Sequence, residues 1–171
     1  LQCSFSSIMH KSQKSYTLPV DKNPSCVIIK EKGNKRTKPM KLREILKHVD
    51  HTLLTPTAVW EDIRKVCDEA IRWGAASVCI PPSYVKAAAE YVAGGIPICT
   101  VIGFPNGYAT AAVKCFEADR AAADGAEEID MVVNLGCVRA GADDMVLEEI
   151  NGVKDACGGR LLKVIVETCL L

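Results

Sequence analysis

The sequence unit that decides the fold occupies residues 110–133 and reads TAAVKCFEADRAAADGAEEIDMVV. Its first part is rich in alanine and ends at Gly125, which predicts a helix over residues 110–125. Its second part, Glu128-Ile129-Asp130-Met131-Val132-Val133, is β-rich and has the length of a strand. A helix that leads closely into a strand indicates a strand–helix–strand repeat.

The same plan extends to both sides of this unit. Helical runs that end in glycine alternate with short β-rich runs, and the first helical run is expected to begin at Thr55-Pro56 and to end at Gly74. The predicted strands are residues 49–54, 77–80, 98–103, 128–133 and 161–168, and the other helices are expected to begin near Ser83, Thr110 and Asp143. The predicted order is (βα)₄β.

Repeats of this kind form a parallel α/β sheet, because a parallel return needs a crossover that is usually helical. An open nucleotide-binding sheet would have a glycine-rich turn after its first strand, whereas Leu54-Thr55-Pro56-Thr57 follows that strand here. A closed barrel is therefore favoured. A complete (β/α)₈ TIM barrel takes about 200 to 250 residues, so we expect residues 44–171 to form an incomplete barrel.

Residues 1–43 differ from the rest of the chain in composition. Residues 1–47 contain eleven Lys and Arg against three Asp and Glu, whereas residues 48–171 contain ten against eighteen. The first segment shows no apolar period, so we expect a disordered basic N-terminal extension. A basic tail can bind anions, but the lack of interleaved aromatics argues against nucleic acid. A lack of early acidic residues is also a feature of organelle targeting segments.

Composition excludes an integral membrane protein and a disulfide scaffold. Hydrophobic residues occupy 49% of the 171 positions, but no apolar run approaches the ~20 residues that cross a bilayer. The nine cysteines include no closely spaced pair of the kind that zinc and redox sites use. We expect reduced thiols in a cytoplasmic protein that holds no metal and no cofactor.

The candidate site residues are charged side chains in the predicted strands, because a charge is costly to bury unless it is paired. They are Asp50, Asp130, Lys163 and Glu167, with Lys163 and Glu167 on one face of the last strand. Carboxylates that converge with a lysine suit proton transfer or imine chemistry. The alternative is a buried ion pair that only fixes strand register. Cys79 is a candidate for the same interior, or else a packed core thiol.

Five motifs resemble the deoxyribose-phosphate aldolase family, in the family's order and spacing. They are Asp50-His51-Thr52-Leu53-Leu54, Ala76-Ser77-Val78-Cys79-Ile80-Pro81, Thr100-Val101-Ile102-Gly103-Phe104-Pro105-Asn106-Gly107, the segment 128–134 and Lys163-Val164-Ile165-Val166-Glu167-Thr168-Cys169-Leu170. The resemblance covers residues 44–171. It implies a (β/α)₈ barrel that reversibly cleaves 2-deoxyribose 5-phosphate into acetaldehyde and glyceraldehyde 3-phosphate through a lysine imine, without metal.

The resemblance also implies roles for individual residues. Asp130 matches the family's proton-shuttling aspartate, Asp50 and Cys79 match positions at the same pocket, and Lys163 matches a fifth-strand lysine that does not form the imine. The family's imine lysine lies in a Lys-Thr-Ser-Thr-Gly-Phe-like segment on the sixth strand, and a second lysine precedes a Gly-Gly segment on the seventh. This chain contains neither segment, so we expect a fragment or a truncated product that is inactive alone.

Two alternatives stay open at this point. Lys163 could itself form the imine, flanked by Asp130 and Glu167. The chain could instead be a non-catalytic half-barrel interaction module whose basic tail docks to an anionic partner. The open edges of the first and fifth strands favour pairing with another chain, for example as a homo-oligomer. The ligand that the resemblance implies is a small phosphosugar.

Overall fold

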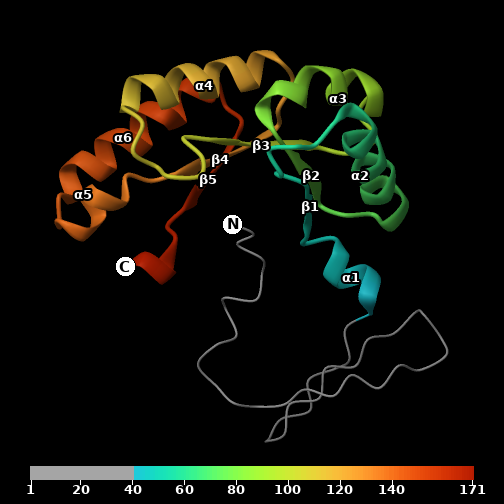
Figure 1. The fold of residues 1–171 in the computed structure, drawn as a ribbon, viewed down its shortest axis with the longest axis horizontal. Coiled ribbons are helices and arrows are strands. Elements are labelled where there is room, and N and C mark those ends of the chain that lie inside the picture. Colours follow the sequence, from blue (N-terminus) through green and yellow to red (C-terminus); the bar gives the residue numbers. More distant parts are fainter. Residues whose placement is uncertain (1–40) are drawn as a thin grey trace, which may run out of the picture. The chain divides into compact units, whose positions relative to one another are not determined.

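The computed structural model describes residues 41–171 (Figure 1). The chain divides into two compact units, residues 1–45 and residues 46–171. The first unit is described only from residue 41 on, where the short helix α1 spans Leu42–Leu46. The predicted tail at residues 1–43 and any targeting segment in it therefore lie almost wholly outside the described residues.

The second unit contains a five-stranded parallel sheet whose strands pair in sequence order, β1-β2-β3-β4-β5. Its strands are β1 (Asp50–Thr52), β2 (Ser77–Ile80), β3 (Ile98–Ile102), β4 (Glu128–Val132) and β5 (Leu161–Ile165). Its longer helices are α2 (Trp60–Trp73), α3 (Val85–Val92), α4 (Ala111–Ala123) and α6 (Asp143–Ala156). Each longer helix joins two neighbouring strands, so the predicted (βα)₄β order is confirmed.

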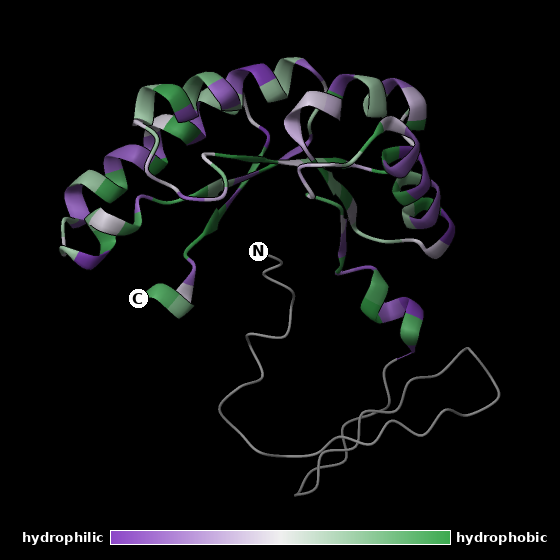
Figure 2. Ribbon diagram, in the orientation of Figure 1, coloured by the Kyte–Doolittle hydropathy of each residue, from purple (hydrophilic) through white to green (hydrophobic). Residues whose placement is uncertain are grey.

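The longer helices cover one face of the sheet (Figure 1). Alternate strand residues pack against them in the main core, because successive side chains of a strand point to opposite faces. These core residues include Val78, Ile80, Ile98, Ile102, Ile129 and Met131. Strands β2 to β5 are coloured mostly as hydrophobic in Figure 2, whereas β1 is hydrophilic and each helix carries both colours. A parallel sheet with helices on one face is the architecture of an incomplete TIM barrel, as predicted.

Three local features differ from the sequence prediction. Helix α2 begins at Trp60 and not at Thr55-Pro56, because the backbone N–H of Val59 donates to the Asp62 carboxylate at 3.1 Å and fixes the start of the helix there. Strand β5 ends at Ile165, and a 3₁₀ turn spans Thr168–Leu170.

A short helix α5 (Leu135–Arg139) also precedes α6, and the sequence did not predict it. The side chain of Asn134 accepts a hydrogen bond from the Cys137 N–H at 3.2 Å and caps this helix. In the part of the chain that the structure describes, no helix is both long and apolar enough to cross a membrane.

Candidate active site

Charged residues lie on the sheet face that points away from the main core. Ile129 and Met131 are fully buried against the helices, so strand alternation turns Asp130 to the opposite face. The register of β4 and β5 pairs Asp130 with Lys163. Cys79 and Cys99 are buried on the same face, in a small cluster separate from the main core. We call this side of the sheet the inner face.

The ammonium group of Lys163 is the centre of the inner face. Its Nζ lies 2.7 Å from Asp50 Oδ2, 2.9 Å from Glu128 Oε2 and 3.2 Å from Asp130 Oδ1. Asp50 belongs to the first strand and Lys163 to the last, and these strands are not neighbours in the sheet. Their contact therefore shows that the sheet curves around the inner face, as a barrel wall does.

The carboxyl of Asp130 is the group best suited to proton transfer. Its Oδ1 is buried and lies 3.2 Å from the Lys163 ammonium, but among the described residues it makes no hydrogen bond of good geometry. Burial raises the pKa of Asp130 above its usual value, although the charge of Lys163 opposes this shift. A carboxyl with a raised pKa beside a cation can act as a general acid or base.

Asp50 and Lys163 remain charged. Burial alone would raise the pKa of Asp50, but hydrogen bonds from Lys163 and from Ser77 Oγ, at 2.7 Å each, outweigh it and lower the pKa. Burial alone would lower the pKa of Lys163, but hydrogen bonds to Asp50 and Glu128 outweigh it and raise the pKa. A nucleophilic lysine must lose its proton, so this geometry argues against Lys163 as the imine-forming residue.

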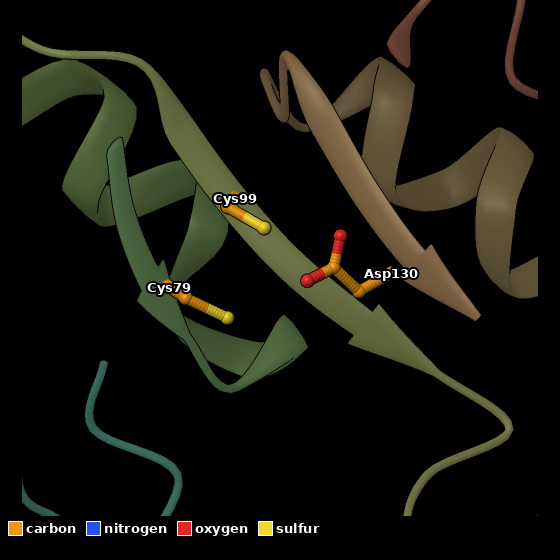
Figure 3. Close-up of side chains that lie close together, drawn as sticks. All are labelled: Cys79, Cys99 and Asp130. Atoms are coloured by element: carbon orange, nitrogen blue, oxygen red, sulfur yellow. The ribbon is translucent and has the colours of Figure 1, made fainter. Parts of the chain in front are cut away.

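Two thiols complete the inner face (Figure 3). Cys79 and Cys99 are paired in register on β2 and β3, and their sulfur atoms and an Asp130 carboxylate oxygen lie within 4.8 Å of one another. A hydrogen bond with Cys79 and burial raise the pKa of Cys99 well above its usual value. Metal ions bind the thiolate and not the thiol. Because the Lys163 ammonium already lies 3.6 Å from Cys99 Sγ, this trio is a poor fit for a metal cation.

The structure does not bring the last predicted site residue into this group. Glu167 lies beyond the end of β5, in a left-handed backbone conformation with φ of 44°, so the expectation that it continues the strand face of Lys163 is wrong. Its carboxylate accepts a hydrogen bond from Cys169 Sγ at 2.9 Å. No ion pair joins Glu167 to Lys163 among residues 41–171.

Sequence reasoning missed two members of the inner face, Glu128 and Cys99. Each lies two residues before an inner-face residue of its own strand, Asp130 and Val101 respectively. Strand alternation alone could therefore have found both of them.

A cavity of about 250 Å³ opens where β1, β2 and β3 end. Thr55, Ser83, Gly103, Phe104 and Glu117 are among the residues that line it. In β/α barrels the active site is built from the loops at these carboxyl ends. The cavity therefore lies on the edge of the sheet where a barrel enzyme receives its substrate.

A partial β/α barrel whose inner face groups a lysine with three carboxylates is typical of barrel enzymes. The family model described as DeoC/LacD family aldolase matches residues 40–171, and the chain belongs to this family. The five motifs that resemble deoxyribose-phosphate aldolase are therefore confirmed as signs of family membership.

The relatives agree with this assignment. A deoxyribose-phosphate aldolase of Streptococcus pyogenes serotype M4 is 58% identical over 132 residues, which are 77% of this chain and 59% of that protein. A deoxyribose phosphate aldolase of Aeropyrum pernix, whose structure is described as tetrameric, superposes with a TM-score of 0.69 at 34% identity, over 75% of this chain and 55% of that one. This chain thus spans about three fifths of the length of its curated relatives.

Proposed function

We propose that this chain provides the first five strands of an aldolase that cleaves 2-deoxyribose 5-phosphate into acetaldehyde and glyceraldehyde 3-phosphate. The observation that carries the proposal is the half-buried carboxyl of Asp130, whose Oδ1 is buried and lies 3.2 Å from the Lys163 ammonium and whose pKa is raised. Membership of an aldolase family supports the same activity. It does not favour the alternative of a non-catalytic interaction module.

Asp130 has a defined task in this reaction. Cleavage requires a base that takes the proton of the C3 hydroxyl while the C2–C3 bond breaks, and an acid that returns a proton to C2. A single carboxyl of raised pKa can do both in turn. The electron pair of the broken C2–C3 bond becomes the C1–C2 double bond of an enamine, and the π pair of the protonated imine moves to its nitrogen. After a proton returns to C2, water hydrolyses the imine and releases acetaldehyde. We infer that the imine lysine lies in the sixth-strand segment that this sequence does not contain.

Lys163, Asp50 and Cys79 would support this task without forming the imine. Lys163 holds a positive charge next to Asp130 and so stabilises the carboxylate when it forms. Asp50 holds Lys163 in place through the 2.7 Å contact. Cys79 lies against Cys99 on the same inner face. We also propose that the protein works in the cytoplasm and pairs with further copies of itself, as the tetramer of the Aeropyrum pernix protein suggests.

The test is a chain that is extended beyond residue 171 by the part of the Streptococcus pyogenes relative that follows the matched segment. Release of glyceraldehyde 3-phosphate from 2-deoxyribose 5-phosphate is measured with a coupled dehydrogenase. We expect turnover, and we expect Asp130→Asn to lower kcat by about 10²- to 10⁴-fold.

Asp119→Asn is the matched control, because Asp119 is an exposed carboxylate on α4. A folded extended chain without turnover would refute the proposed activity. An Asp130→Asn variant that is as active as the parent would refute the role of Asp130.

A further inference from the structure

Lys114 is the largest fully buried side chain among residues 41–171, and it takes no part in the inner-face cluster. It lies in the first turn of α4. Its ammonium donates three hydrogen bonds, to Gly107 O at 2.7 Å, to Val132 O at 2.8 Å and to Glu149 Oε1 at 2.7 Å. All three N–H donors are therefore used.

The acceptors of Lys114 belong to three different parts of the fold. Gly107 lies in the loop between β3 and α4, Val132 is the last residue of β4, and Glu149 lies on α6. The second carboxylate oxygen of Glu149 accepts a hydrogen bond from the backbone N–H of Asn134 at 2.9 Å. The pair thus ties a loop, a strand end and a helix together at the carboxyl end of the sheet.

The loop at residues 103–107 is shaped around this lysine. A Cβ atom on Gly103, whose φ is 57°, would lie 2.8 Å from Lys114 Cε, so only glycine leaves room for the lysine stem. The N–H of Gly103 donates to the Glu117 carboxylate at 2.8 Å, and the N–H of Gly107 donates to Gly103 O at 2.8 Å. Gly103, Phe104 and Glu117 also line the 250 Å³ cavity.

We infer that Lys114 and Glu149 are positioning residues, which fix the 103–107 loop and the end of β4 where substrate binds. This inference rests on the proposed function. An apolar pair of similar volume could fill the same space without burying charge, but it would leave the surrounding backbone groups without hydrogen-bond partners. Only the polar pair supplies hydrogen bonds in fixed directions to two carbonyls and one N–H, and these bonds hold the wall of the cavity in place.

The test uses the extended chain and the double variant Lys114→Met/Glu149→Met. Removing both partners leaves no buried unpaired charge, but it leaves the Gly107 and Val132 carbonyls and the Asn134 N–H without these partners, so the variant should fold with a lower Tm and is assayed well below that temperature. We expect the KM for 2-deoxyribose 5-phosphate to rise about tenfold while kcat stays within about twofold, because the loop loses its anchor but Asp130 keeps its partners. A purely structural role would lower Tm but would leave the KM of the folded variant unchanged.

The control is Arg120→Ala/Asp124→Ala, which removes an exposed ion pair from α4. Its KM should equal that of the parent. If the methionine pair does not fold, Glu149→Gln replaces it, and a KM increase of about threefold is then expected. A parent-like KM in the folded variant would overturn the inference, as would a loss confined to kcat. An inactive parent would instead refute the proposed function.

Discussion

Two lysines of this protein are ion-paired in opposite ways. Lys114 is fully buried between the sheet and two helices, and its ammonium meets one carboxylate and two carbonyls at hydrogen-bond distance. Lys163 lies on the inner face with 32% of its side chain exposed, and its ammonium meets three carboxylates. One environment is balanced in charge and hydrogen bonds, and the other has an excess of negative charge.

The difference separates an anchor from the proposed reactive centre. Around Lys114, Glu149 accepts hydrogen bonds with both of its oxygens, so no group is left to exchange a proton. Around Lys163, Asp130 keeps an oxygen without a hydrogen bond and has a raised pKa. Incomplete pairing of buried charges is costly, and it is typical of sites that do chemistry.

Breaking the anchor should have the largest effect on stability. Lys114→Met leaves the Glu149 carboxylate buried without its cation, so we expect the free energy of unfolding to fall by about 3–5 kcal/mol. Urea denaturation of the full chain measures it. Arg120→Ala is the control, because Arg120 is 64% exposed in its pair with Asp124, and its cost should stay below about 1 kcal/mol. Equal losses in both variants would contradict the anchor role.

Breaking the proposed reactive centre should cost less stability. Lys163→Met leaves three carboxylates close together, but water reaches this site, so we expect a loss of about 1–3 kcal/mol at neutral pH. The variant should also raise the pKa of Asp130 further, because the nearby cation is lost. Carboxyl ¹³C NMR measures this shift. If the pKa of Asp130 fell instead, the assigned environment of that carboxyl would be wrong.

The difference between these two lysines was only half visible in the sequence. Lys163 lies in an apolar strand, where a charge draws attention, and the β4–β5 register places it beside Asp130 as strand alternation predicts. Lys114 lies in a helix that also carries exposed Arg120 and Glu117, so nothing in its own segment marks it as buried. Its acceptors come from a loop, a strand end and another helix, which only the tertiary fold brings together.

The course of the backbone also limited the sequence prediction at β5. The sequence 161–168 is apolar enough to be a strand throughout, but the structure turns after Ile165. A left-handed residue at Glu167 then removes its side chain from the face of Lys163. The strand order and the grouping of Asp50, Asp130 and Lys163 depend on long-range periodicity and could be predicted, whereas this single backbone angle could not.

A smaller effect is expected where a neutral group supports the inner face. Ser77 is fully buried and donates to Asp50 Oδ1 at 2.7 Å. Ser77→Ala should therefore cost about 0.5–1.5 kcal/mol in urea denaturation. Ser83→Ala, at an exposed serine, is the control and should change stability by less than about 0.5 kcal/mol. Ser77→Ala should also raise the pKa of Asp50, because Asp50 loses a hydrogen bond. An unchanged pKa would mean that Lys163 alone sets it.

The smallest effect is a division of the pH dependence between two aspartates. Asp50 has a lowered folded pKa, so its contribution to stability is present above 3.8 and is lost as the pH falls through the folded value. Asp130 has a raised folded pKa, so it destabilises the folded chain at neutral pH, and this penalty disappears as the pH falls from the raised value toward 3.8. Urea denaturation at a series of pH values gives the free energy of unfolding as a function of pH. Asp130→Asn should flatten this curve above pH 3.8, whereas Asp50→Asn should flatten it below pH 3.8. If both variants changed the same pH window, the two carboxyls would share one environment, and the case for Asp130 as the proton-transferring group would fail.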